Sequence, residues 1–88
     1  MNHIYYPQGT CSKMIEVQTT GDVIDNVAFM GGCHGNLQGI SKLVKGMNID
    51  DVINTLEGIK CGYKSTSCPD QLAQALKQIK AQMSTLDE

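Results

Sequence analysis

Four cysteines are the residues of this 88-residue chain best suited to chemistry: Cys11, Cys33, Cys61 and Cys68. The chain has no tryptophan or arginine and only two histidines, and its acidic residues are scattered. Any chemistry would therefore rest on sulfur. Three roles are open: metal ligation, thiol redox exchange, or inert packing in a core or dimer interface.

Two of the cysteines fall where helices are predicted to begin. Cys33 follows a predicted strand, and Cys68 is predicted to cap the last helix. Unpaired N–H groups and partial positive charge at a helix start stabilise the thiolate, which binds metals and attacks disulfides. The glycines around Cys33 permit close approach to a ligand, although they serve a simple turn equally well.

The cysteines are 22, 28 and 7 residues apart, so the chain contains no CxxC pair of the zinc-ribbon or thioredoxin kind. Cys11 and Cys33 would lie at neighbouring ends of an antiparallel hairpin. A loop of six residues separates Cys61 from Cys68. We therefore expect the four sulfurs to meet at one end of the sheet.

Two further residues are candidate accessory ligands of this cysteine site. His34 adjoins Cys33, although a single loop histidine is more often simply solvated. Asp70 follows Cys68 by two residues, and its simplest role is a first-turn carboxylate facing the helix dipole.

The apolar periodicity that must position these residues predicts strands first and helices second. Residues 11–20 and 23–30 alternate as strands, with Gly21-Asp22 as the hairpin turn. A third, edge strand is expected at Ile4–Tyr6, before Pro7. The side chains expected on one face of the second hairpin strand are Val23, Val27 and Phe29.

Three helices are predicted after residue 35. The first two are capped by Asn36 and Asn48, and the third has Pro69 at its first helical position. The expected apolar stripes are Leu37, Ile40, Val44 and Met47; Val52, Ile53, Leu56 and Ile59; and Leu72, Leu76, Ile79, Met83 and Leu86. The sequence thus predicts one α+β domain over residues 1–88, a small antiparallel sheet covered by three helices.

Composition narrows the function classes. A net charge of −2 with dispersed lysines argues against nucleic-acid binding. The amino terminus does not resemble a signal peptide, and no apolar run is long enough to span a membrane. We therefore expect a cytoplasmic protein with reduced thiols, which favours zinc or iron–sulfur ligation, or thiol catalysis, over a disulfide framework. A domain this small is also often stabilised by a metal or by forming a homodimer.

The run Thr66-Ser67-Cys68-Pro69-Asp70, with Met30-Gly31-Gly32-Cys33-His34-Gly35-Asn36 upstream, resembles the TSCPD domain family, in particular its short four-cysteine members. Such domains also occur at the carboxyl end of cobalamin-dependent ribonucleotide reductases. The resemblance implies a protein partner of that kind and a link to deoxynucleotide synthesis. It does not imply a reductase active site, since 88 residues cannot hold that enzyme's barrel.

The order of the cysteines is also similar to that of IscU-type iron–sulfur scaffold proteins, which implies an IscU-like fold. The matching positions are Cys11, Cys33, Lys45-Gly46 and Cys68. The scaffold's aspartate after the first cysteine is missing, and Ser67 replaces its last histidine. On this resemblance Cys61 would supply the missing ligand.

Overall fold

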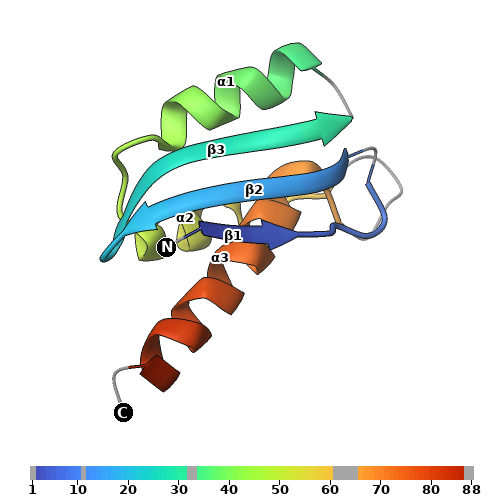
Figure 1. Ribbon diagram of the computed structural model, residues 1–88. Coiled ribbons are helices and arrows are strands. Elements are labelled where there is room, and N and C mark those ends of the chain that lie inside the picture. The colour runs from blue at the N-terminus through green and yellow to red at the C-terminus, as the bar shows by residue number, and fades with distance from the viewer. Residues whose placement is uncertain (1, 11, 32–33, 61–65, 87–88) are drawn as a thin grey trace.

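The fold is described by a computed structural model covering residues 2–10, 12–31, 34–60 and 66–86. Three strands precede three helices, so the predicted α+β class is confirmed (Figure 1). The elements are β1 (Asn2–Tyr5), β2 (Ser12–Thr20), β3 (Val23–Gly31), α1 (His34–Val44), α2 (Ile49–Leu56) and α3 (Cys68–Leu86).

The strands form one antiparallel sheet in the order β1-β2-β3. Gly21, with a φ of +59°, makes the turn between β2 and β3, as its place in the sequence predicts. The edge strand is also confirmed, because Tyr5 pairs with Ile15 at the end of β1. Ile15 and Val17 are fully buried and form the centre of the inner face.

The predicted face of β3 is wrong at Val23, which is 42% exposed, whereas its neighbour Ile24 is fully buried. The pairing register shifts between Gln18 and Thr19, where β3 carries one residue more than β2. A bulge of this kind interrupts the two-residue alternation. It therefore turns Ile24, rather than Val23, to the same side as Val27.

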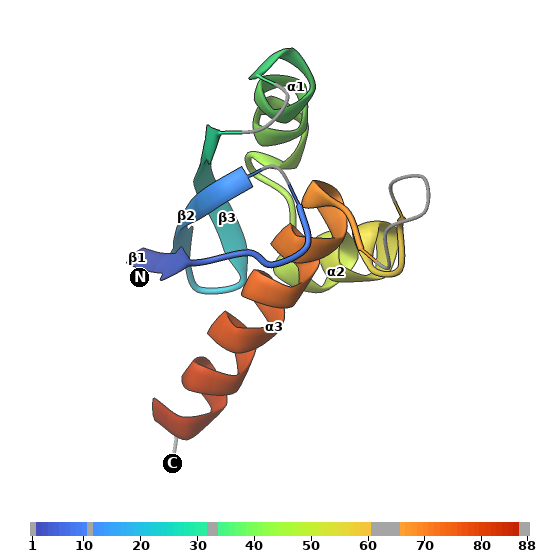
Figure 2. The same ribbon diagram turned by 90° about the vertical axis from the view of Figure 1, so that its right-hand side faces the viewer.

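Helix α3 packs on one face of the sheet and α2 packs against α3, while α1 runs alongside β3 (Figures 1 and 2). The face of the sheet turned toward the viewer in Figure 1 carries none of the three helices. The stripe predicted for the last helix is confirmed at its buried members Leu72, Leu76 and Ile79. These side chains join the core made by the inner face of the sheet, α2 and the end of α1.

One boundary of each of the two shorter helices differs from the prediction. Helix α1 begins at His34, so Asn36 lies inside it, and packing of Leu37 and Val44 overrides the local capping preference. Helix α2 is capped by Asn48 as predicted, but it ends at Leu56. Ile59 therefore lies beyond the helix and is 41% exposed.

The ends of the two shorter helices explain why their apolar stripes stop early. Gly46 has a φ of +84° and ends the α1 segment, as predicted, which leaves Met47 outside the helix. Gly58, with a φ of +87°, turns the chain after α2. Residues beyond these glycines no longer follow the helical period.

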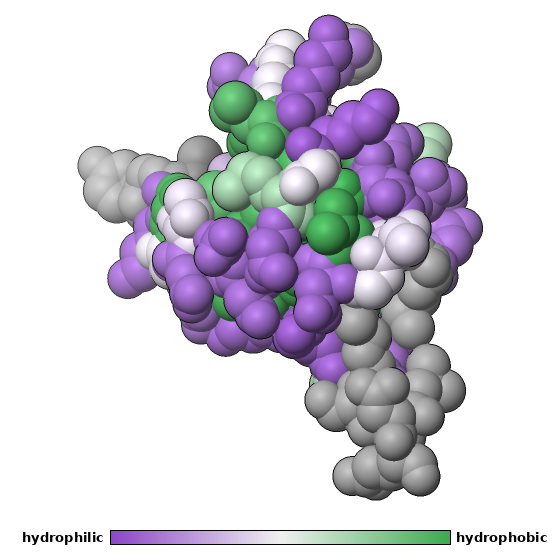
Figure 3. Space-filling view, turned by 90° about the vertical axis from the view of Figure 1, so that its left-hand side faces the viewer, coloured by the Kyte–Doolittle hydropathy of each residue, from purple (hydrophilic) through white to green (hydrophobic). Residues whose placement is uncertain are grey.

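The surface seen from the left of Figure 1 is mostly hydrophilic, with a small hydrophobic area in its middle (Figure 3). Exposed apolar side chains include Val23 and Met47, which lie on two segments joined by the hydrogen bond from Ile24 N to Met47 O. None of the helices in the described ranges is both long and apolar enough to span a bilayer.

Candidate functional site

The start of α3 is built by Ser67. Its Oγ accepts a hydrogen bond from Asp70 N at 3.1 Å and donates one to Ile59 O at 2.7 Å. Ser67 is therefore the cap, and the helix begins at Cys68, one residue earlier than the predicted start at Pro69. A serine hydroxyl is a stronger acceptor for the free amides of a first turn than a thiol, which explains the shift.

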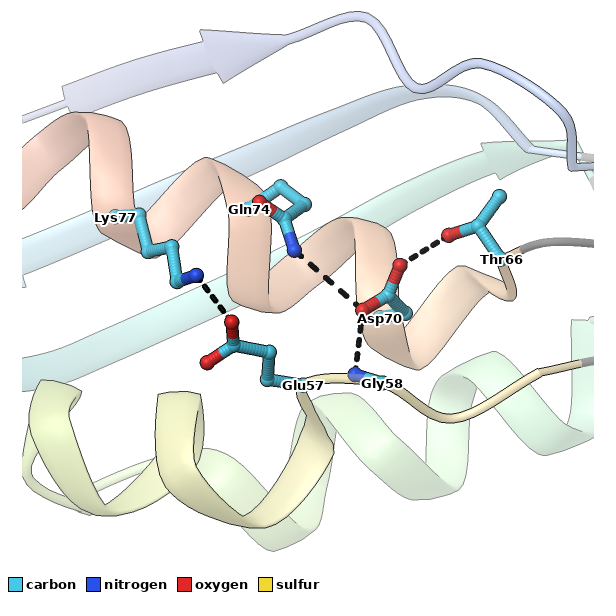
Figure 4. Close-up of polar contacts among 6 residues, drawn as sticks. All are labelled: Glu57, Gly58, Thr66, Asp70, Gln74 and Lys77. Carbon is cyan, nitrogen blue, oxygen red and sulfur yellow. Dashed lines mark hydrogen bonds and ion pairs between the residues drawn. The ribbon is translucent and has the colours of Figure 1, made fainter.

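The carboxylate of Asp70 lies at the centre of a hydrogen-bond network (Figure 4). Thr66 Oγ1 donates to its Oδ2, and Gly58 N donates to its Oδ1 at 2.7 Å. Gln74 Nε2 makes a longer contact of 3.5 Å with Oδ1. Asp70 therefore joins the first turn of α3 to the loop that follows α2, a structural role beyond the predicted interaction with the helix dipole.

Asp70 is only 7% exposed, and burial by itself would raise its pKa. The hydrogen bonds from Thr66, Gly58 and Gln74, together with the charge of Lys77, outweigh that effect and hold the pKa below its usual value. Asp70 is therefore a carboxylate at neutral pH. This network uses both of its oxygens.

Gln71 extends the network to the first strand. Its Nε2 donates to Thr66 Oγ1 at 2.9 Å. Its Oε1 accepts from Tyr5 Oη at 3.2 Å and from Gln8 N at 3.1 Å. Gln71 was not predicted as a site residue. Its one local signal in the sequence is that a polar residue directly follows the Thr66–Asp70 motif, in the first turn of an amphipathic helix.

About two turns beyond Asp70 along α3, Lys77 forms an ion pair with Glu57 (Figure 4). Both side chains are more than two-fifths exposed, so water and salt screen the pair. This pair marks the solvent side of the contact between α2 and α3. It contributes little to holding the start of α3.

Cys68 is half-buried, and its Sγ lies 2.9 Å from Ser12 Oγ. Ser12 opens β2, is 4% exposed, and directly follows Cys11 in the sequence. The contact joins the start of β2 to the start of α3, across 56 positions of the chain. A hydroxyl donor and the helix amides are the groups that stabilise a thiolate.

Cys11, Cys33 and Cys61 lie outside the described residues, and His34 is the first residue of α1. In the described part of the chain, which includes one of the four cysteines, no three potential metal-ligating side chains converge. Sequence neighbours of the cysteines are nevertheless paired. Ser12 is opposite Gly31, and Ile59 O accepts from Ser67 Oγ at 2.7 Å.

These features define a class of protein: a small α+β domain in which a buried polar network fixes a cysteine at the start of the last helix. A family model, that of the TSCPD domain, matches residues 2–80, and the chain therefore belongs to the TSCPD domain family. No curated protein and no solved structure matches the chain. The similarity to IscU-type scaffolds stays a prediction.

Proposed function

We propose that this chain is a small metal-binding module in which Cys11, Cys33, Cys61 and Cys68 hold zinc or an iron–sulfur cluster. The observation that carries the proposal is the contact between Ser12 Oγ and Cys68 Sγ. Consecutive Cα atoms are about 3.8 Å apart, so this contact supports a position of Cys11 close to Cys68.

The sequence neighbours of the other two cysteines support the same convergence. Gly31 pairs with Ser12 and precedes Cys33 by two residues. Ile59 is hydrogen-bonded to Ser67, the neighbour of Cys68, and precedes Cys61 by two residues. A two-residue step reaches at most about 7 Å, which supports the proposal that the four thiols would share one ion with Zn–S bonds of about 2.3 Å.

The donor set suits either metal form. Four thiolates are the usual ligands both of structural Zn²⁺ and of iron–sulfur clusters. Cys68 would be held by the serine cap and by the contact with Ser12, which orient it before a metal binds. His34 and Asp70 remain candidates for accessory roles, although Asp70 already has partners for both oxygens.

In the cell we place this module in the reducing cytoplasm, as an accessory protein of a ribonucleotide reductase in deoxynucleotide synthesis. The basis is the association of TSCPD domains with cobalamin-dependent reductases. The chain would act as a stabilising or docking partner, with no active site of its own.

A second candidate function is thiol redox exchange through Cys61 and Cys68. It is favoured by the half-buried position of Cys68 at a helix start, where thiolate is stabilised. The two thiols would form a disulfide and give two electrons and two protons to a disulfide of the partner protein.

The test is metal analysis and visible absorption of protein purified without oxygen. Stoichiometric zinc in colourless protein, or iron and sulfide with visible absorption, supports the module. Each of the four Cys→Ser variants should then lose the metal, whereas Ser41→Ala, a hydroxyl deletion within α1, should keep it. Metal-free wild-type protein would contradict the proposal, and a reversible Cys61–Cys68 disulfide in it would favour redox exchange.

A further inference from the structure

A groove of about 400 Å³ lies between β3 and α1. Its β3 side is made by Asn26, Val27, Ala28, Phe29 and Gly31. Its α1 side is made by Leu37, Gln38, Ser41 and Lys42. Successive strand residues point to opposite faces of a sheet, so a groove lined by four in a row follows the edge of the strand.

This edge of β3 already accepts main-chain pairing at one end. Ile24 N donates to Met47 O at 3.0 Å, and Gly46 N donates to Ile24 O at 2.7 Å. Next to them, Val23 and Asn48 form an antiparallel bridge. The segment after α1 therefore behaves as a short added strand, which shows that the edge has a geometry suited to strand addition.

Beyond this pairing, the edge of β3 has no main-chain partner among the described residues. Within the described ranges, no backbone hydrogen bond from outside the sheet reaches residues 26–30. β3 is the last strand in the order β1-β2-β3. An edge with unpaired main-chain groups is a template for a further strand.

The lining of the groove indicates what that strand carries. Phe29 and Leu37 supply apolar contact, and Gln38 and Ser41 are polar. Among the described residues that line the groove, Lys42 is the charged one. Since α1 begins after β3 and ends beside Ile24, Lys42 stands toward the Ile24 end of the groove.

We propose that this groove binds an extended peptide of a partner protein, which adds to the edge of β3 as an antiparallel strand with a carboxylate beside Lys42. A peptide antiparallel to β3 runs in the same direction as the Gly46–Asn48 segment, which is also antiparallel to β3. Its carboxyl end then lies at the Lys42 end. Main-chain hydrogen bonds supply binding, and alternate apolar side chains enter the groove.

The test is an NMR titration of the full, isotope-labelled chain with synthetic acetyl-VTVTVE carrying a free carboxyl terminus, up to about 1 mM. Saturable shifts at the amides of residues 26–31 and 37–42 are expected. The matched peptide acetyl-VTVTVQ-amide has no carboxylate, and acetyl-VPVPVE lacks two main-chain donors. Both should bind several-fold more weakly.

Two surface variants distinguish a specific contact between Lys42 and the peptide carboxylate from a general effect of the protein's net charge. Lys42→Glu should weaken binding of the acidic peptide about fivefold or more. Lys45→Glu makes the same change one turn away, outside the groove lining, and should leave binding nearly unchanged. Circular dichroism of both variants checks that the fold is intact.

Three results would overturn the proposal. The first is an absence of saturable shifts, or shifts at β1 instead of β3. The second is equal binding of the acidic and amide peptides to wild type and to Lys42→Glu. The third is a shift of the groove amides with protein concentration alone, because a second copy of the chain would then be the occupant.

Discussion

Ser12 and Cys68, 56 positions apart, lie with Oγ and Sγ 2.9 Å from each other. One residue opens the central strand, and the other opens the longest helix. This contact sets the position of the thiol relative to the sheet. It also connects the two sequence regions that contain the first and last cysteines.

Replacing Ser12 by alanine should lower the free energy of unfolding by about 1 kcal/mol, because it removes a buried hydroxyl together with its hydrogen bond to Cys68. Ser41→Ala is the matched control. In the described part of the chain, the Ser41 hydroxyl bonds Leu37 O of its own helix, and alanine has the higher helix propensity. Denaturant unfolding measures both, and equal effects would show that the Ser12 contact adds nothing.

Replacing Asp70 by asparagine should cost roughly 1.5–3 kcal/mol of stability at neutral pH, since the buried carboxylate accepts charge-assisted hydrogen bonds. Asp51→Asn makes the same change at an exposed first-turn position of α2. It should cost only about 0.3–1 kcal/mol through the helix dipole. Equal losses in the two variants would contradict the network.

The stability difference between wild type and Asp70→Asn should depend on pH. The pKa of Asp70 is lower in the folded chain than the ordinary value of about 3.9, so the folded state binds fewer protons than the unfolded state. The stabilisation is therefore complete above about pH 4 and is lost as the pH falls through the folded pKa. The stability gap between wild type and Asp70→Asn should narrow over that range, and a constant gap would contradict the pKa shift.

Replacing Gly9 by alanine should destabilise the chain more than replacing Gly46. Both glycines have positive φ, +76° and +84°, so each alanine costs roughly 1–2 kcal/mol. Only at Gly9 would the new Cβ meet another side chain, at 3.1 Å from Thr66 Cγ2. Thr66 is held by Asp70 and Gln71 and cannot easily yield. Thermal unfolding of both variants compares them directly, and similar midpoints would show that Thr66 adapts.

Removing the proposed metal should destabilise the wild type and leave Cys68→Ser unaffected. Metal that binds the folded state alone adds to its stability by mass action, and chelation removes that contribution. The measurement is the unfolding midpoint with and without a strong chelator. A wild-type midpoint that is the same in both conditions would contradict the metal site, whereas the Asp70 predictions would still stand.

Local sequence signals were sufficient for much of this fold. The turn at Gly21, the cap at Asn48 and the stripe of α3 each depend on neighbouring residues, so periodicity and capping preference identified them. The TSCPD motif also identified the family. Its cysteine was placed within one residue of the helix start.

Only the tertiary structure decided which side chains meet. The bulge in β3 places Ile24 in the core instead of Val23, and the turn at Gly58 leaves Ile59 outside α2. The bond between Gln71 and Tyr5 spans 66 positions, and the contact between Ser12 and Cys68 spans 56. Such contacts depend on how β1, β2 and α3 pack around a shared core, which no local pattern encodes. The sequence therefore determined the elements and the motif, and packing determined the partners of each motif residue.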